Sequence, residues 1–334
     1  MKDSPVVPTV DFDADGVQHG FLRLPWSGNE SAWGNIMIPL SVIRHGSGPT
    51  ALFTGASHGD EYEGPIALVD LARTLTADEI KGRVIIVPFM NMPAFRAGAR
   101  LSPLDGCNMN RVFPGRPEGT PTEKIADFFQ RALLPIADIV LDFHSGGRTL
   151  DFVPFAACHA LADRTQDERC RAARDAFAAP YAMTMVEIDP AGMYDEAAEA
   201  LGKVFVTTEL GGGGTATACS AAIAKRGARN LLRHAGILDG APAGEPSVEL
   251  EMPGAECFAF SESVGMVEPV VDLGDMVKQG DLLALVHPID RLGAPAVEYH
   301  AEMDGMLVGR HFPGLVGVGD CLAVLARRTG RAAA

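Results

Sequence analysis

A histidine and a carboxylate with the spacing of metal ligands follow a short apolar segment. His58 and Glu61 lie in the stretch 55–64, after the apolar run 51–55 and before a helical pattern at 65–75. The run predicts a buried strand, and open α/β sheets bind ligands at the carboxyl ends of their strands. Zn²⁺ prefers imidazole nitrogen and carboxylate oxygen, and catalytic sites take three such ligands from the protein. The spacing alone is a weak signal, because a polar loop can hold such a pair without a metal.

His144 is the candidate third ligand. It follows the apolar run 139–143, which predicts another buried strand. If the two strands are neighbours, His144 lies at the same edge as the first pair, so the sequence predicts a zinc site. Asp142 is suited to orient an imidazole, as carboxylates do behind metal-binding histidines, or it is structural. The remaining histidines lack such settings, and we expect them to be surface or satisfied interior residues: His19, His45, His159, His234, His287, His300 and His311.

Hydrolysis at a metal site also needs a proton acceptor, and Glu209 has a suitable position. It directly follows the run 203–208, which predicts a further strand, and the glycines 211–214 come shortly after it. A carboxylate there can take a proton from water and pass it to a leaving amine. The glycines lack the Lys-Ser/Thr pair of a phosphate-binding loop, which argues against a nucleotide site. The structural alternative is that the glycines only pack beside the sheet.

Arginines concentrate in one segment of this acidic chain, at Arg96, Arg100, Arg111 and Arg116. A guanidinium can grip a carboxylate with two hydrogen bonds, and it can stabilise an oxyanion. The segment is therefore a candidate site for a carboxylate-bearing substrate. A surface cluster of ion pairs is the alternative.

The elements that hold these residues alternate between strands and helices. Apolar, β-branched runs predict buried strands at 51–55, 84–89, 139–143 and 203–208. Helical periodicity marks 65–75, 122–134, 167–177, 195–201 and 218–234. This alternation indicates an α/β domain around a largely parallel sheet.

The pattern changes after a Pro/Gly-rich segment at 239–246. Short strands then alternate with turns, and the stretch 276–286 recurs at 315–325, which predicts a pseudo-symmetric β module. It resembles a biotinyl/lipoyl-type hammerhead, but the segment 301–306 lacks the lysine of those carriers. We expect the module to shape or cover a site. The predicted domains are 1–245, catalytic, and 246–330, β-rich.

Length and charge exclude several classes of protein. The chain has 334 residues, 47% of them hydrophobic, which suggests about two globular domains. Its net charge of −15 argues against binding to nucleic acid or to an anionic membrane surface. We find no secretory signal pattern and no apolar stretch long enough to cross a membrane. The six scattered cysteines fit free thiols, so we expect a cytoplasmic protein.

These segments together resemble the succinylglutamate desuccinylase/aspartoacylase family of the zinc carboxypeptidase-like superfamily. The matching residues, in the family's order, are His58, Glu61, Asn110, Arg111, His144 and Glu209. The resemblance implies an α/β fold, a mixed sheet flanked by helices, with a C-terminal all-β module that is hammerhead- or barrel-like.

The resemblance also implies a role for each residue. His58, Glu61 and His144 would hold one Zn²⁺ per subunit. Arg100, or Arg96 nearby, would polarise the scissile carbonyl. Asn110 and Arg111 would bind the α-carboxylate of a small N-acyl amino acid, and Glu209 would act as general base and then acid. A homo-oligomer, a dimer, is expected on the same ground.

Three stretches resemble in particular the family members that deacetylate N-α-acetyl-L-2,4-diaminobutyrate in ectoine breakdown. They read GASHGDEYEGPIAL, RLSPLDGCNMNRVFPG and LDFHSGGRTLDFVPFA. The ammonium of that substrate needs a negative partner, for which Glu187, Asp189 and Asp195 are candidates or else solvated loop charges. Other N-acyl amino acid deacylases, a metallocarboxypeptidase and a non-catalytic binding protein remain alternatives.

Overall fold

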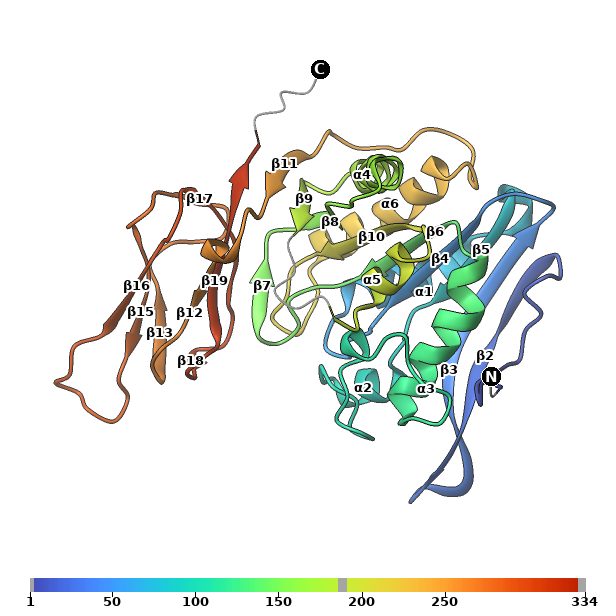
Figure 1. Ribbon diagram of the computed structural model, residues 1–334, viewed down its shortest axis with the longest axis horizontal. Helices are drawn as coiled ribbons and strands as arrows, with labels where there is room; N and C mark the ends of the chain where they lie inside the picture. The colour runs from blue at the N-terminus through green and yellow to red at the C-terminus, as the bar shows by residue number, and fades with distance from the viewer. Residues whose placement is uncertain (1–2, 186–190, 330–334) are drawn as a thin grey trace.

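The computed structural model describes residues 3–185 and 191–329, which build a long sheet with helices on both faces (Figure 1). The strands are β1 (Val7–Pro8), β2 (Gly16–Gly28), β3 (Ser31–His45), β4 (Thr50–Gly55), β5 (Gly82–Val87), β6 (Ile139–Phe143), β7 (Leu150–Phe152), β8 (Phe155–His159), β9 (Tyr181–Met185), β10 (Val204–Glu209), β11 (Val248–Glu251), β12 (Phe258–Phe260), β13 (Gly265–Pro269), β14 (Met276–Val277), β15 (Leu282–His287), β16 (Val297–His300), β17 (Gly305–His311), β18 (Leu315–Val316) and β19 (Cys321–Arg328). The α-helices are α1 (Glu63–Thr74), α2 (Met92–Ala97), α3 (Pro121–Phe128), α4 (Arg164–Phe177), α5 (Tyr194–Glu199) and α6 (Ala218–His234).

The four strands predicted from apolar runs form the centre of the sheet. β4 runs parallel to β5 on one side and to β6 on the other, and β10 runs parallel to β6. Both faces of these strands are covered, which explains why their sequences are continuously apolar rather than alternating. β3 and β8 flank the centre in the antiparallel sense. The sheet is therefore mixed, as the family resemblance implied.

Helices cover the two faces of the central sheet in different sets. α1, α4 and α6 pack on one face, where Leu68, Phe177 and Leu231 belong to one buried cluster. α3 and α5 lie on the other, with Ile125 and Tyr194 in a second cluster that also receives side chains from the β2–β3 hairpin. Within 3–185 and 191–329, no helix combines the length and the apolar character needed to span a membrane.

The β-rich C-terminal part is drawn in orange and red in Figure 1. Some of its strands continue the main sheet, and β13, β15, β16 and β18 form a separate antiparallel sheet. β11 pairs with β9 in parallel and with β19 in the antiparallel sense, so hydrogen bonds cross the predicted domain boundary without a break. The sequence repeat takes the form of two strand–turn–strand units. The short strand of each unit pairs with the strand that precedes the other unit, β14 with β17 and β18 with β13. This is the hammerhead-like arrangement that the resemblance implied, while the division at 245/246 stays a prediction.

Parallel strands place the candidate site at one edge of the sheet. Gly55 at the end of β4 lies opposite Phe143 at the end of β6, and Thr207 in β10 lies opposite Asp142. The residues that follow these three strands therefore meet at a common rim, as parallel pairing requires.

Candidate active site and metal centre

Three donor groups meet at this rim. His58 and Glu61 come from the loop between β4 and α1, and His144 follows β6 directly. The His58 Nδ1 atom lies 2.8 Å from Glu61 Oε1, and the His144 Nδ1 atom lies 3.0 Å from Glu61 Oε2. All three side chains are buried, and their ligand atoms lie within 4.8 Å of one another. The structure thus brings together the three residues predicted as metal ligands.

The other nitrogen of each imidazole faces an oxygen acceptor. His58 Nε2 lies 3.0 Å from Asn108 Oδ1, and His144 Nε2 lies 2.8 Å from Asp142 Oδ2. We assign the proton to Nε2 in both rings because each partner oxygen accepts a hydrogen bond. The Nδ1 atoms then face the Glu61 carboxylate, and a proton or a metal ion must lie between each nitrogen and the carboxylate oxygens. Two imidazoles and one carboxylate are a donor set that fits Zn²⁺.

Electrostatics favour a positive charge at this place. Burial opposes ionisation of Glu61, yet the two histidines hold the pKa of its carboxyl well below its usual range. Burial lowers the pKa of His58, against the effect of Glu61. Burial would also lower the pKa of His144, but Asp142 and Glu61 raise it well above the ordinary value. Carboxylates that stabilise a proton here also stabilise a metal ion, which displaces that proton when it binds.

Two residues behind the ligands are themselves held in place. Asp142 Oδ1 accepts a 2.6 Å hydrogen bond from Thr54 Oγ1, on the neighbouring strand β4. Asn108 Oδ1 also lies 3.0 Å from the backbone N–H of Asn110. The orienting role considered for Asp142 therefore has a structural basis. Sequence reasoning missed Asn108, although it stands two residues before Asn110 in the same stretch.

Glu209 lies level with His144 on the adjacent strand. The pairing of Thr207 with Asp142 sets this register, and the Leu210 N–H donates to the His144 carbonyl oxygen at 3.2 Å. Its side chain is half-buried, so it is not sequestered in the core. The predicted base and the predicted ligands thus share one rim.

The glycines after Glu209 allow a close approach between segments. A Cβ atom at Gly212 would lie 1.9 Å from the Leu150 carbonyl oxygen, and one at Gly213 would lie 2.6 Å from the ring of Phe312. Phe312 belongs to the C-terminal module, and its backbone N–H donates to the Thr149 carbonyl oxygen. The module therefore contacts the loops beside the rim, in line with the expectation that it shapes the site.

The two arginines considered for the carbonyl lie in different places. Arg100 Nη1 lies 3.3 Å from His58 Nδ1 and 3.7 Å from Glu61 Oε1, so its guanidinium reaches the candidate metal centre. Its side chain remains 48% exposed, so it borders solvent. Arg96 instead lines a separate cavity of about 500 Å³ together with Trp26. The geometry favours Arg100 over Arg96.

Asn110 and Arg111 form a short turn next to the ligands. Asn110 is buried, and its Oδ1 atom accepts a 2.9 Å hydrogen bond from the Tyr194 N–H. The Arg111 side chain is anchored by a 2.6 Å bond from Nη1 to the Asn110 carbonyl oxygen, and the residue is exposed. Arg116 forms a 2.7 Å ion pair with Glu123, as in the surface cluster of ion pairs that was the alternative to a substrate site.

Of the candidates for the negative end of the pocket, the structure describes only Asp195, and it lies away from this rim. Asp195 is buried, and its Oδ2 atom lies 3.7 Å from the Nε2 atom of His159. His159 ends β8, which runs antiparallel to β10 with Phe155 opposite Glu209, so His159 lies away from the rim. Asp195 is therefore neither a solvated charge nor a neighbour of Glu209. Glu187 and Asp189 lie outside the described residues.

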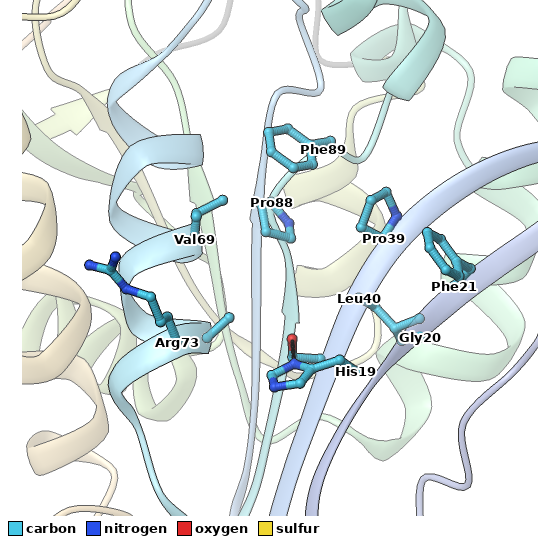
Figure 2. A pocket seen from close by; sticks show the side chains of 11 residues that line it. His19, Gly20, Phe21, Pro39, Leu40, Val69, Arg73, Pro88 and Phe89 are labelled. Atoms are coloured by element: carbon cyan, nitrogen blue, oxygen red, sulfur yellow. Dashed lines mark hydrogen bonds between the residues drawn. The ribbon is translucent and has the colours of Figure 1, made fainter.

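A different pocket, of about 410 Å³, lies between α1 and the β2–β3 hairpin (Figure 2). Figure 2 shows Val69 and Arg73 of α1 on one side, Phe21 and Pro39 of the β2–β3 hairpin on the other, and Phe89 near its upper end. None of the predicted site residues lines it. The chemistry-bearing groups are at the strand ends instead.

Comparisons with known proteins bear on this geometry. Residues 47–235 match the model of the succinylglutamate desuccinylase/aspartoacylase catalytic domain. The chain is 54% identical over 328 residues to the N-alpha-acetyl-L-2,4-diaminobutyric acid deacetylase of Halomonas elongata, covering 98% of this chain and 96% of that protein.

Solved structures agree with these matches. The product-bound ectoine utilization protein EutE (DoeB) of Ruegeria pomeroyi is 59% identical, with a TM-score of 0.96, and the match covers 98% of this chain and 100% of that one. A succinylglutamate desuccinylase/aspartoacylase from Rhodobacter sphaeroides is 37% identical, with a TM-score of 0.93 and coverage of 98% and 100%. The chain belongs to the succinylglutamate desuccinylase/aspartoacylase family.

Proposed function

We propose that this protein is a zinc-dependent amide hydrolase. Its reaction would convert N-α-acetyl-L-2,4-diaminobutyrate into L-2,4-diaminobutyrate and acetate during ectoine breakdown. The main support for a hydrolase is that the buried side chains of His58, Glu61 and His144 lie close together, at the same edge of the sheet as Glu209. The names of the Halomonas elongata and Ruegeria pomeroyi relatives support the substrate and the pathway.

In this proposal each residue at the rim has one task. His58, Glu61 and His144 would hold a zinc ion, which would supply Lewis-acid chemistry by lowering the pKa of water and polarising a carbonyl. Glu209 takes the proton of the attacking water and delivers it to the departing amine. Arg100 donates hydrogen bonds to the carbonyl oxygen as negative charge develops there. Its position at the candidate centre, with a solvent-facing side, suits that task.

The substrate's α-carboxylate is the proposed partner of Asn110 and Arg111. A guanidinium matches the geometry of a carboxylate, and an exposed arginine beside a buried centre is accessible to a small ligand. The Asn110 side chain is fixed by Tyr194, so it offers a pre-organised contact rather than a mobile one. Such a grip would place the acetyl group of the substrate over the metal ligands.

We propose further that the protein is cytoplasmic and forms a homodimer. All six cysteines are free thiols in the structure, which suits a reducing compartment. The dimer rests on the family resemblance, and light scattering of the purified protein tests it directly.

Replacing the third ligand should abolish metal binding. In His144→Ala we expect the zinc content to fall from about one ion per chain to near zero, because two protein ligands bind Zn²⁺ too weakly to retain it. Atomic emission after dialysis against a weak chelator measures this. His287→Ala, which alters a surface pair with Glu268, is the matched control and should keep its zinc. One tightly held zinc ion in His144→Ala would refute the ligand assignment.

Removing the proposed base should separate binding from chemistry. Glu209→Gln keeps the size of the side chain and loses its basicity. We expect zinc content and KM to stay near wild type, and kcat to fall by about 10²- to 10⁴-fold. Steady-state kinetics checks this, with the exposed Glu268→Gln as control. Wild-type turnover in Glu209→Gln would remove this residue from the mechanism.

A substrate panel distinguishes the proposed function from its relatives. The panel contains α- and γ-acetyl-diaminobutyrate, N-acetylaspartate, N-succinylglutamate and a C-terminal dipeptide. We expect the α-acetyl compound to give the highest kcat/KM, measured by release of the free amine. Faster hydrolysis of N-succinylglutamate or N-acetylaspartate would assign a different acyl amino acid, and faster cleavage of the dipeptide would indicate a carboxypeptidase.

A further inference from the structure

A second glutamate is buried next to the candidate centre, and the mechanism above does not use it. Glu63 opens α1 two residues after Glu61, and it is only 2% exposed. Its Oε1 atom accepts a 3.2 Å hydrogen bond from Ser220 Oγ, at the start of α6. A buried carboxyl is costly unless it is hydrogen-bonded, so a placement of this kind calls for a role.

The second oxygen of this carboxyl and a neighbouring serine hydroxyl lack hydrogen-bond partners. Neither Glu63 Oε2 nor Ser145 Oγ has a hydrogen-bond partner in the structure, and both atoms are buried. Burial raises the pKa of the Glu63 carboxyl, and the neighbouring hydroxyls of Ser145 and Ser220 oppose that rise. A small rotation of the Ser145 hydroxyl would let it donate to Oε2, which removes both unsatisfied atoms at once.

Glu63 thereby lies beside the segments that carry Glu61, His144 and Glu209. It belongs to the segment of Glu61, and Ser145 is the residue after His144. Gly211, two residues after Glu209, also lies close to Glu63. A Cβ atom at Gly211 would lie 3.1 Å from Glu63 Oε1. Direct bonds tie the same segments together, since the Gly146 N–H donates to the Gly211 carbonyl oxygen at 2.9 Å.

We propose that Glu63 is a positioning residue that sets the distance between Glu209 and the ligands Glu61 and His144. One carboxyl oxygen accepts from Ser220, and the other is the acceptor for the Ser145 hydroxyl once that hydroxyl rotates. Glu63 is not a metal ligand and not a catalytic residue, because its oxygens are directed at serine hydroxyls behind the rim. The inference rests on the proposed hydrolase function, which gives the distance its importance.

The effect of losing Glu63 should appear in turnover rather than in substrate binding. Catalytic groups must be placed to well within 1 Å, and a misplacement of that size can cost about 100-fold in rate. The α-carboxylate grip at Asn110 and Arg111 lies on another segment, so KM should change little.

The test compares three variants with the wild type. Glu63→Ala removes both hydrogen bonds, whereas Glu63→Gln keeps one acceptor and one donor of the same shape. The control is Glu79→Ala, which removes an exposed glutamate that caps another short helix through Thr76. For each variant, kcat, KM, zinc content and the urea midpoint are measured.

We expect Glu63→Ala to lose about 10- to 100-fold in kcat, with KM and zinc content near wild type. Glu63→Gln should restore kcat to within about threefold of wild type, because its amide oxygen still accepts from one serine hydroxyl and its amide N–H can donate to the other. Glu79→Ala should keep wild-type kcat and lose only some stability.

Wild-type kcat in Glu63→Ala overturns the proposal. So does a Glu63→Gln variant as slow as Glu63→Ala, since the charge and not the hydrogen-bond geometry would then matter. If Glu63→Ala does not fold, Ser145→Ala and Ser220→Ala each remove one bond, and unchanged kcat in both overturns it as well. A wild-type protein that hydrolyses no N-acyl amino acid refutes the proposed function instead.

Discussion

The rest of the site depends on one electrostatic constraint. Two imidazole Nδ1 lone pairs and both oxygens of Glu61 face one another in a buried volume, with N···O distances of 2.8 and 3.0 Å. Lone pairs and carboxylate oxygens repel one another unless a proton or a metal ion lies between them. Salt screens this repulsion only weakly, because the groups are buried. The protein holds this arrangement by fixing the far side of each ring, at Asn108 and Asp142.

Those two residues connect the ligands to the rest of the fold. Asn108 joins His58 to the turn of Asn110, and Asn110 in turn receives the N–H of Tyr194, the first residue of α5. On the other side, Asp142 joins His144 to Thr54 in the next strand. Hydrogen bonds therefore connect the candidate carboxylate grip to the ligand His58, on the side of the site away from Glu63.

Much of this could be predicted from the sequence, for a physical reason. Strands buried on both faces are continuously apolar, so β4, β6 and β10 were recognisable, and the polar residues after them had to meet at one edge. His58, Glu61, His144 and Glu209 follow from that rule. Their order in the chain also matched a known family, which the comparisons confirmed.

What could not be predicted depends on contacts between distant segments. Periodicity does not reveal that Glu63 meets Ser220, or that Arg100 rather than Arg96 turns toward His58. Asp195 resembled a loop charge but is buried beside His159, because α5 packs over that end of the sheet. The Pro/Gly-rich linker suggested a separate module, whereas β11 continues the sheet across it.

X-ray absorption spectroscopy of the zinc-loaded protein measures whether His58, Glu61 and His144 hold the metal. We expect a first shell of nitrogen and oxygen at about 2.0–2.1 Å, with outer-shell scattering from two imidazoles. His58→Ala should remove one imidazole from that signal. A sulfur ligand near about 2.3 Å, or a shell without two imidazoles, would contradict it.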